Sequence, residues 1–120
     1  MAYIINAKQS PRIEDGILKW YEGDTFSFVW TINITNKDTG NPIIFMLEDS
    51  IDFEFFNEFG QLIQVFHFGN IPTDNKVRLD FNEDVSKKFR RGKYKYSIKY
   101  NGINIVTIGA SNKAEVEKCH

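Results

Sequence analysis

Hydrophobic and polar residues alternate over several stretches of this chain, as they do in β-strands that bury one face. In residues 25–34, TFSFVWTINI, every second residue from Phe26 to Ile34 is apolar, and Val29 is the only apolar residue out of phase. Residues 94–100 alternate in the same way, with tyrosine or isoleucine at one set of positions and lysine or serine at the other. Because successive side chains of a strand point to opposite faces, both stretches predict strands that cover a core.

Shorter stretches of the same kind predict further strands at residues 17–20, 51–56, 62–68, 76–81, 103–109 and 113–118. Turn-forming residues separate these stretches. Residues 35–42, TNKDTGNP, predict a connection. Gly60 is expected to supply a positive φ in a hairpin after the strand at 51–56. Asn101-Gly102 predicts a second hairpin.

One segment, residues 84–91, favours a helical turn. Asn82 or Asp84 would cap it, and Gly92 would end it. We therefore expect seven to nine short antiparallel strands and at most this one turn of helix. Many short strands with turn signals between them are typical of an all-β sandwich, in which two sheets hide their apolar faces from water.

The composition supports a single domain rich in strands. A chain of 120 residues is long enough for one core. Its eleven Phe, five Tyr and two Trp are residue types that strands favour. We expect residues 1–12 to form an amino-terminal arm or edge strand, because Pro11 cannot donate a hydrogen bond to a sheet. Residues 13–120 are expected to form the single β-sandwich domain.

The sequence favours a protein that is made in the cytoplasm. Cys119 is the only cysteine, so no intrachain disulfide forms. Residues 1–16 lack the pattern of a signal peptide, and no apolar run is long enough to cross a bilayer. We therefore expect no membrane partner.

No motif in the sequence predicts catalysis, a metal site or a cofactor. His67 and His120 are the only histidines, and neither has a second ligand at metal-binding spacing. Residues 80–84 begin like a calcium loop, but Val85 replaces the turn glycine and Arg91 replaces the bidentate glutamate. Nucleophile elbows, phosphate loops and dinucleotide fingerprints are absent as well. We expect a protein that is not an enzyme.

The charges are divided unevenly along the chain. Residues 1–60 hold four Lys/Arg and ten Asp/Glu, whereas residues 61–120 hold eleven Lys/Arg and six Asp/Glu. A basic patch is predicted at Lys87, Lys88, Arg90, Arg91, Lys93 and Lys95, and a complementary acidic patch at Glu48, Asp49, Asp52 and Glu54. Opposite patches on different surfaces favour head-to-tail contacts between copies, although solvation alone also explains such exposed charges.

Nucleic acid is a less favoured partner for the basic patch. Cations can bind phosphates, and neighbouring aromatic rings can stack on bases. In a strand, however, Tyr94 and Tyr96 point to the face opposite Lys93 and Lys95. Rings and cations are then separated by the sheet and cannot line one groove.

Residues 79–96, LDFNEDVSKKFRRGKYKY, resemble the corner between strands E and F of immunoglobulin-type domains. In that family, a tyrosine at the position of Tyr94 turns its hydroxyl back onto the upstream backbone. Tyr96 stands where antibody domains carry their second cysteine, so the resemblance is to relatives without the disulfide. It implies an immunoglobulin-like Greek-key sandwich, with a jelly roll or another Greek key as the alternatives.

Residues 17–118 resemble, more loosely, the amino-terminal domain of tail baseplate proteins from phages of Gram-positive bacteria. The shared features are Gly23-Asp24 before an amphipathic strand, the connection Thr39-Gly40-Asn41-Pro42, a hairpin at Gly60 and a late strand at Gly92-Lys93-Tyr94. The resemblance implies a structural role in a virion or tail-like particle whose β domains pack around an axis. Longer baseplate proteins continue into helices and receptor-binding parts, whereas the present sequence stops at His120. The resemblance therefore implies no direct receptor role.

We therefore expect a non-enzymatic structural protein of a phage or phage-like tail that acts through contacts with other subunits or with itself. Two alternatives remain. In the first, Trp20 and Tyr21 form an exposed aromatic platform that binds carbohydrate or a cell surface. In the second, a small intracellular inhibitor presents a loop such as residues 35–42 to an enzyme.

Overall fold

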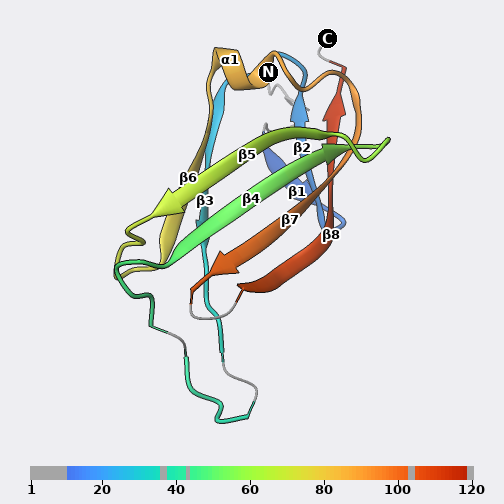
Figure 1. Ribbon diagram of the computed structural model, residues 1–120. Helices are drawn as coiled ribbons and strands as arrows, with labels where there is room; N and C mark the ends of the chain where they lie inside the picture. Colours follow the sequence, from blue (N-terminus) through green and yellow to red (C-terminus); the bar gives the residue numbers. More distant parts are fainter. Residues whose placement is uncertain (1–10, 36–37, 43, 103–104, 119–120) are drawn as a thin grey trace, which may run out of the picture.

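The computed structural model describes residues 11–35, 38–42, 44–102 and 105–118, with the backbone alone over 105–111. The predicted all-β fold is confirmed, because this part of the chain contains strands and one four-residue helix (Figure 1). The elements are β1 (Arg12–Glu14), β2 (Ile17–Tyr21), β3 (Phe26–Thr31), β4 (Ser50–Asn57), β5 (Leu62–Gly69), β6 (Lys76–Phe81), α1 (Glu83–Ser86), β7 (Gly92–Asn101) and β8 (Ile105–Glu117).

The strands form one sheet of six and one sheet of two. The larger sheet has the order β1-β2-β8-β7-β4-β5, and β3 pairs with β6 in the smaller one. Neighbouring strands are antiparallel except β2 and β8, which run parallel with Leu18 opposite Ala114 and Trp20 opposite Val116. The parallel pair departs from the wholly antiparallel arrangement that the sequence predicts.

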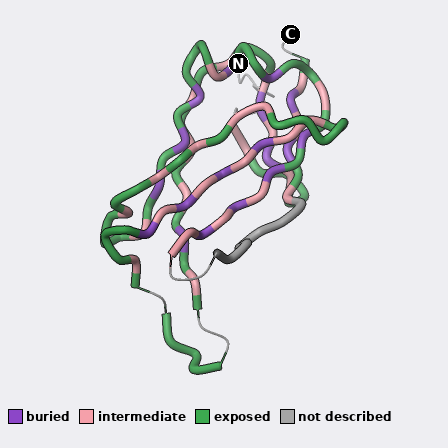
Figure 2. Tube along the Cα trace, viewed as in Figure 1, coloured by how far each residue is buried: buried purple, intermediate pink, exposed green. Residues whose placement is uncertain are grey.

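The two sheets pack face to face through aromatic rings. Trp30 of β3 contacts Phe53 of β4 with 5.7 Å between ring centroids, and Phe81 of β6 contacts Phe55 of β4 at 5.9 Å. Burial alternates along β4 and β7, as the purple and pink segments of Figure 2 show. The alternation of buried and more exposed residues therefore marks the side chains that pack between the two sheets, as predicted.

The hairpin between β4 and β5 forms around Gly60, as predicted. Gly60 adopts φ +79°, a left-handed conformation that strains most residues with a Cβ atom. Asn57 Oδ1 accepts hydrogen bonds from the backbone N–H groups of Phe59 and Gln61, each at 2.9 Å. These bonds replace the sheet hydrogen bonds that the chain gives up where it reverses.

The single helical turn lies near the predicted position, but it ends at Ser86 with Lys87 as its C-cap, well before the predicted stop at Gly92. Asn82 caps α1, because its Oδ1 accepts a 2.9 Å hydrogen bond from the N–H of Val85. Phe89, four residues after Val85, is buried against the rings of Trp20, Phe55 and Phe81. The turn therefore carries an anchor into the core between β6 and β7.

Two predictions concern the ends of the chain. The one for the carboxyl-terminal strands is wrong, and most of the one for the amino-terminal arm lies outside the described residues. The strands predicted at 103–109 and 113–118 are one strand, β8, whose pairing with β7 is irregular between Tyr96 and Lys99. The residues GASN at 109–112 therefore form a bulged part of a strand and no turn. Of the predicted arm at 1–12, residues 1–10 lie outside the described residues, and Arg12 begins the edge strand β1.

The connection between β3 and β4 extends away from the two sheets (Figure 1). Its described residues are 32–35, 38–42 and 44–49, and we call them the extended loop. Thr35 and Pro42 form an isolated antiparallel bridge, so the predicted connection at 35–42 folds back on itself. With this loop the molecule measures 56 × 39 × 24 Å.

Candidate functional site

The outer face of the larger sheet carries the charged side chains of β7 and β8. Tyr94, Tyr96 and Tyr100 point into the core, so Lys93 and Lys95 lie on the opposite face, as predicted. The register of β7 and β8 places Lys93 opposite Glu115 and Lys95 opposite Lys113. This pairing brings two lysines side by side across neighbouring strands.

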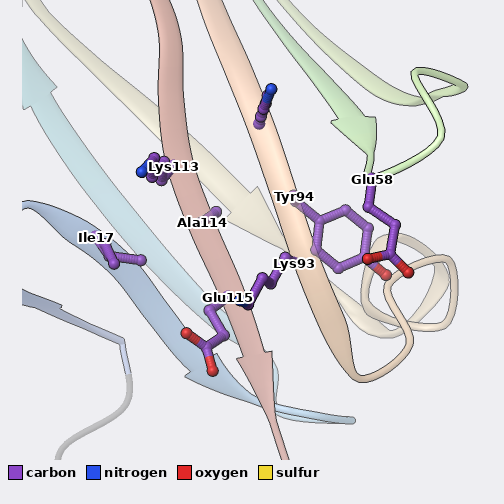
Figure 3. A pocket seen from close by; sticks show the side chains of 8 residues that line it. Ile17, Glu58, Lys93, Tyr94, Lys113, Ala114 and Glu115 are labelled. Carbon is purple, nitrogen blue, oxygen red and sulfur yellow. The ribbon is translucent and has the colours of Figure 1, made fainter.

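A hollow of about 310 Å³ lies beside these lysines, and we call it the lysine hollow (Figure 3). Its lining residues come from β2, β7, β8 and the β4–β5 hairpin: Ile17, Glu58, Lys93, Tyr94, Lys95, Lys113, Ala114 and Glu115. Within the described residues, Lys93, Lys95 and Lys113 make no ion pair. The lysine hollow therefore combines three unpaired ammonium groups with room for a ligand.

The other members of the predicted basic patch lie around α1 and the start of β7. Lys87 pairs with Glu83 at 3.5 Å, and Lys88 donates to Gln64 at 2.8 Å. Arg91 reaches Glu22, with 3.8 Å between Nε and Oε1. Arg90 is exposed in the connection before β7. The structure thus divides the predicted patch into three cations with intrachain partners, the exposed Arg90 and the lysines of the outer face.

The predicted acidic patch does not form one continuous surface. Asp49 is buried, and its Oδ2 accepts hydrogen bonds from the Tyr100 hydroxyl at 2.7 Å and the Met46 N–H at 2.8 Å. Asp49 is therefore an internal acceptor, which corrects its predicted place on the surface. Glu48 is exposed.

The remaining two members of the acidic patch have partners within the sheet. His67 Nδ1 lies 2.5 Å from Asp52 Oδ1, and Asn101 donates to Asp52 Oδ2 at 2.9 Å. Glu54 pairs with Lys99 at 2.5 Å. Both carboxylates lie on the outer face of β4, and neighbouring strands already neutralise or hydrogen-bond them.

Buried tyrosines on the inner face of β7 have raised pKa values. Burial raises the pKa of Tyr96 to about 12. Burial first, and then the hydrogen bond and negative charge of Asp49, raise the pKa of Tyr100 to about 12. These hydroxyls stay protonated at neutral pH and act as structural groups.

The aromatic platform predicted at Trp20 and Tyr21 is wrong. Trp20 is 0% exposed and lies among the rings of Phe26, Phe81 and Phe89, with centroid distances of 5.1 to 5.6 Å. Its ring therefore has no face that a sugar could stack on. Tyr21 is half-buried, and the guanidinium of Arg12 lies 5.7 Å from its ring centroid.

The hydroxyl of Tyr94 donates a 2.6 Å hydrogen bond to the backbone carbonyl of Arg90. This is the contact that the immunoglobulin resemblance implies. Burial, as the largest effect, raises the pKa of Tyr94. The bond joins the start of β7 to the connection that follows α1.

Large apolar side chains at the base of the extended loop were not among the predicted site residues. Ile44 is 80% exposed, Leu47 is 79% exposed and Met46 is 65% exposed. We call these three residues the apolar segment. The sequence signal was the apolar run IIFML at 43–47, which follows a turn-rich connection and shows no strand alternation. Phe59, at the tip of the β4–β5 hairpin, is exposed as well.

The described residues contain no group of three His, Cys, Asp or Glu side chains arranged to hold a metal ion. Among these same residues, no helix has the length and apolar composition needed to span a membrane. Comparisons of the chain with protein-family models, with curated proteins and with solved structures find no match.

Proposed function

We propose that this chain is a non-enzymatic structural protein of a phage or phage-like tail, incorporated into the particle and acting through contacts with other protein subunits. The proposal combines an immunoglobulin-like Greek-key sandwich with a surface suited to protein contacts. The exposed apolar segment is the observation that carries it. The resemblance to baseplate domains supplies the kind of particle.

The strand order supports the immunoglobulin-like part of the proposal. In such domains strands G, F, C and C′ form one sheet, and strands B and E lie in the other. The order β8-β7-β4-β5 and the pair β3-β6 match this arrangement if β3 is taken as strand B. The hydrogen bond from Tyr94 to Arg90 occupies the matching corner between strands E and F.

The apolar segment supports a role in protein contacts. Soluble monomers rarely expose contiguous apolar patches, and such patches mark interaction sites. Ile44, Met46 and Leu47 lie within four residues of one another on a loop that extends from the sheets. A partner that covers these side chains would gain the free energy of burying them, about 25 cal/mol for each Å² of apolar surface.

The proposal is tested by locating the protein and by changing the apolar segment. We expect mass spectrometry to find the chain in purified tail-like particles of the organism that encodes it. Ile44→Asp with Leu47→Asp should reduce its incorporation, because charged groups cannot be buried there without a partner. Phe59→Asp is the control, because Phe59 is an apolar side chain as exposed as Ile44 and Leu47 but lies on another loop. Absence of the chain from the particles would refute the proposal.

An inhibitor that presents the extended loop is the second candidate function. The bridge between Thr35 and Pro42 holds residues 38–42 at the far end of a loop that stands clear of the sheets (Figure 1). A presented loop of this kind suits an enzyme cleft. The test is whether the immobilised protein retains an enzyme and inhibits it. Loss of that inhibition when residues 38–42 are replaced by glycine and serine would favour this candidate.

A further inference from the structure

We infer that the lysine hollow binds the carboxylate side chains of an extended acidic segment from a partner protein. Lys93, Lys95 and Lys113 supply the positive charge. The inference deepens the proposed function, since it rests on a chain that works through protein contacts and names the chemistry of one partner surface. It concerns the outer face of the larger sheet and does not involve the apolar segment.

The pairing of Lys95 with Lys113 is the first step of the argument. Side chains directly opposite on antiparallel strands have Cβ atoms roughly 4.5 to 5.5 Å apart, and like charges there are destabilising. Glu115 lies opposite Lys93, yet no ion pair joins them within the described residues. The fold therefore holds positive charge together on this face, and within the described residues neither carboxylate of the hollow, Glu58 or Glu115, forms an ion pair with these lysines. A bound carboxylate between Lys95 and Lys113 would relieve the repulsion.

The shape of the site is the second step. The lysine hollow measures about 310 Å³, which is the lower end of the range for ligand pockets. Ile17 lines it on the β2 side (Figure 3). The methylene stems of the lysines add further apolar surface below their charged ends. The methylene groups of a bound glutamate side chain would contact this apolar surface, while its carboxylate reaches the ammonium groups.

The spacing of the cations favours an extended peptide. Lys93 and Lys95 are two residues apart on one face of β7, which places their Cα atoms about 6.6 Å apart. Carboxylates at alternate positions of another extended segment have the same spacing. Such a segment can therefore form charge-assisted hydrogen bonds with both lysines, while Lys113 reaches the same carboxylates from β8.

The surrounding charges favour a short acidic segment over a nucleic acid. The whole chain has a formal net charge of −1, whereas nucleic-acid-binding domains are strongly basic. Glu58 and Glu115 also line the lysine hollow, so its positive charge is confined to three lysines and suits a short acidic segment better than a long line of phosphates. The tyrosine rings of β7 are buried on the other face and cannot stack on bases.

The experiment measures fluorescence anisotropy of a labelled octapeptide with glutamate at alternate positions and valine or serine between. We expect binding that weakens as salt is added. The substitutions Lys95→Glu and Lys113→Glu should each reduce the affinity about tenfold, because they remove one cation and add a repelling carboxylate. Lys76→Glu changes an exposed cation on the smaller sheet and should leave the affinity unchanged.

Thermal unfolding shows whether lost binding reflects a damaged fold. Lys113→Glu places an opposite charge across from Lys95, so its Tm should rise while its peptide affinity falls. If Lys113 had only a structural role, the substitution would change the Tm and the peptide affinity in the same direction.

Three results would overturn the inference. The first is that the wild-type protein does not bind the peptide, and the second is that Lys113→Glu binds it with the same affinity as the wild type. The third is that a single-stranded oligodeoxynucleotide of equal charge binds more tightly than the peptide through the same lysines. The proposed function would survive each of them, because it fails only if the chain is absent from tail-like particles.

Discussion

Tyr94 shows how one hydroxyl group joins two parts of the chain. Its ring is buried beside Phe89, and its hydroxyl donates to the carbonyl of Arg90 at 2.6 Å. The bond is partly buried, so a carbonyl that loses its donor there costs free energy beyond the lost bond. The group therefore holds the connection after α1 against the start of β7.

We predict that Tyr94→Phe lowers the free energy of unfolding by about 1 kcal/mol, because it removes only this hydroxyl. Urea denaturation followed by tryptophan fluorescence measures the change. Tyr96→Phe is the matched control, since within the described residues the Tyr96 hydroxyl has no hydrogen-bond partner. Equal effects of the two substitutions would mean that the bond to Arg90 contributes nothing.

The raised pKa values of Tyr96 and Tyr100 predict that the folded protein loses stability at high pH. Their pKa values of about 12 in the folded protein lie above the usual value of 10.0, so the folded state keeps protons that the unfolded state releases. Their contribution is complete below pH 10.0 and is lost as the pH rises towards about 12. The free energy of unfolding should fall by up to about 1.4 kcal/mol per pH unit for each tyrosine.

The measurement is urea denaturation at a series of pH values between neutral and strongly alkaline. The double substitution Tyr96→Phe with Tyr100→Phe should flatten the dependence, because it removes both groups. An unchanged slope in the double variant would assign the alkaline loss to other residues.

Among the elements, the hairpin between β4 and β5 depends on one backbone conformation. Gly60 has φ +79°, and a Cβ atom built on it would meet no other atom within 4 Å. Any cost of adding a methyl group is therefore backbone strain and no steric clash.

We predict that Gly60→Ala lowers the free energy of unfolding by about 1 to 2 kcal/mol, because alanine is strained in the left-handed region. Gly69→Ala, at the other end of β5, serves as the control, since Gly69 has neither a positive φ nor a close neighbour. Gly60→Asn should cost less than Gly60→Ala, because asparagine tolerates this conformation. A neutral Gly60→Ala would contradict the strained turn.

Local patterns were sufficient to predict most strands and their buried faces. Phe26, Phe28 and Trp30 of β3 do face the other sheet, and Asp52 and Glu54 share the outer face of β4. Trp20 could also have been placed correctly, because it lies two residues from Leu18 and shares its buried face. A strand of four predicted residues gave too little alternation to show this.

Pairing between distant strands could not be predicted from local patterns. The lysine hollow depends on β8 lying beside β7 in a register that places Lys113 opposite Lys95. That register includes an irregular stretch where Tyr96 pairs with Asn112 and Ile98 pairs with Gly109. The turn-forming residues between Gly109 and Asn112 predicted a break in the chain, whereas a bulge accommodates them within the strand.

At the scale of the whole molecule, stability depends on the rings between the two sheets. Phe55 of β4 is fully buried and contacts the rings of Phe66, Phe81, Phe89 and Tyr96. It therefore joins both sheets and Phe89, which lies in the connection between α1 and β7.

We predict that Phe55→Ala lowers the free energy of unfolding by about 3 to 5 kcal/mol, through the lost transfer free energy and the cavity that remains. Phe59→Ala makes the same chemical change four residues later, at a ring that is 81% exposed, and should have little effect. Chemical denaturation measures both. Similar losses in the two variants would contradict the packing of the two sheets against each other.

The parallel pairing of β2 with β8 has a consequence for biosynthesis. β2 leaves the ribosome before its partner residues 114–117, which are added only after all the other strands that the structure describes. Until then, β2 and β7 both lack the neighbour that they share. Contacts of such large sequence separation slow folding. The nascent chain can therefore complete its larger sheet only once β8 has emerged from the exit tunnel.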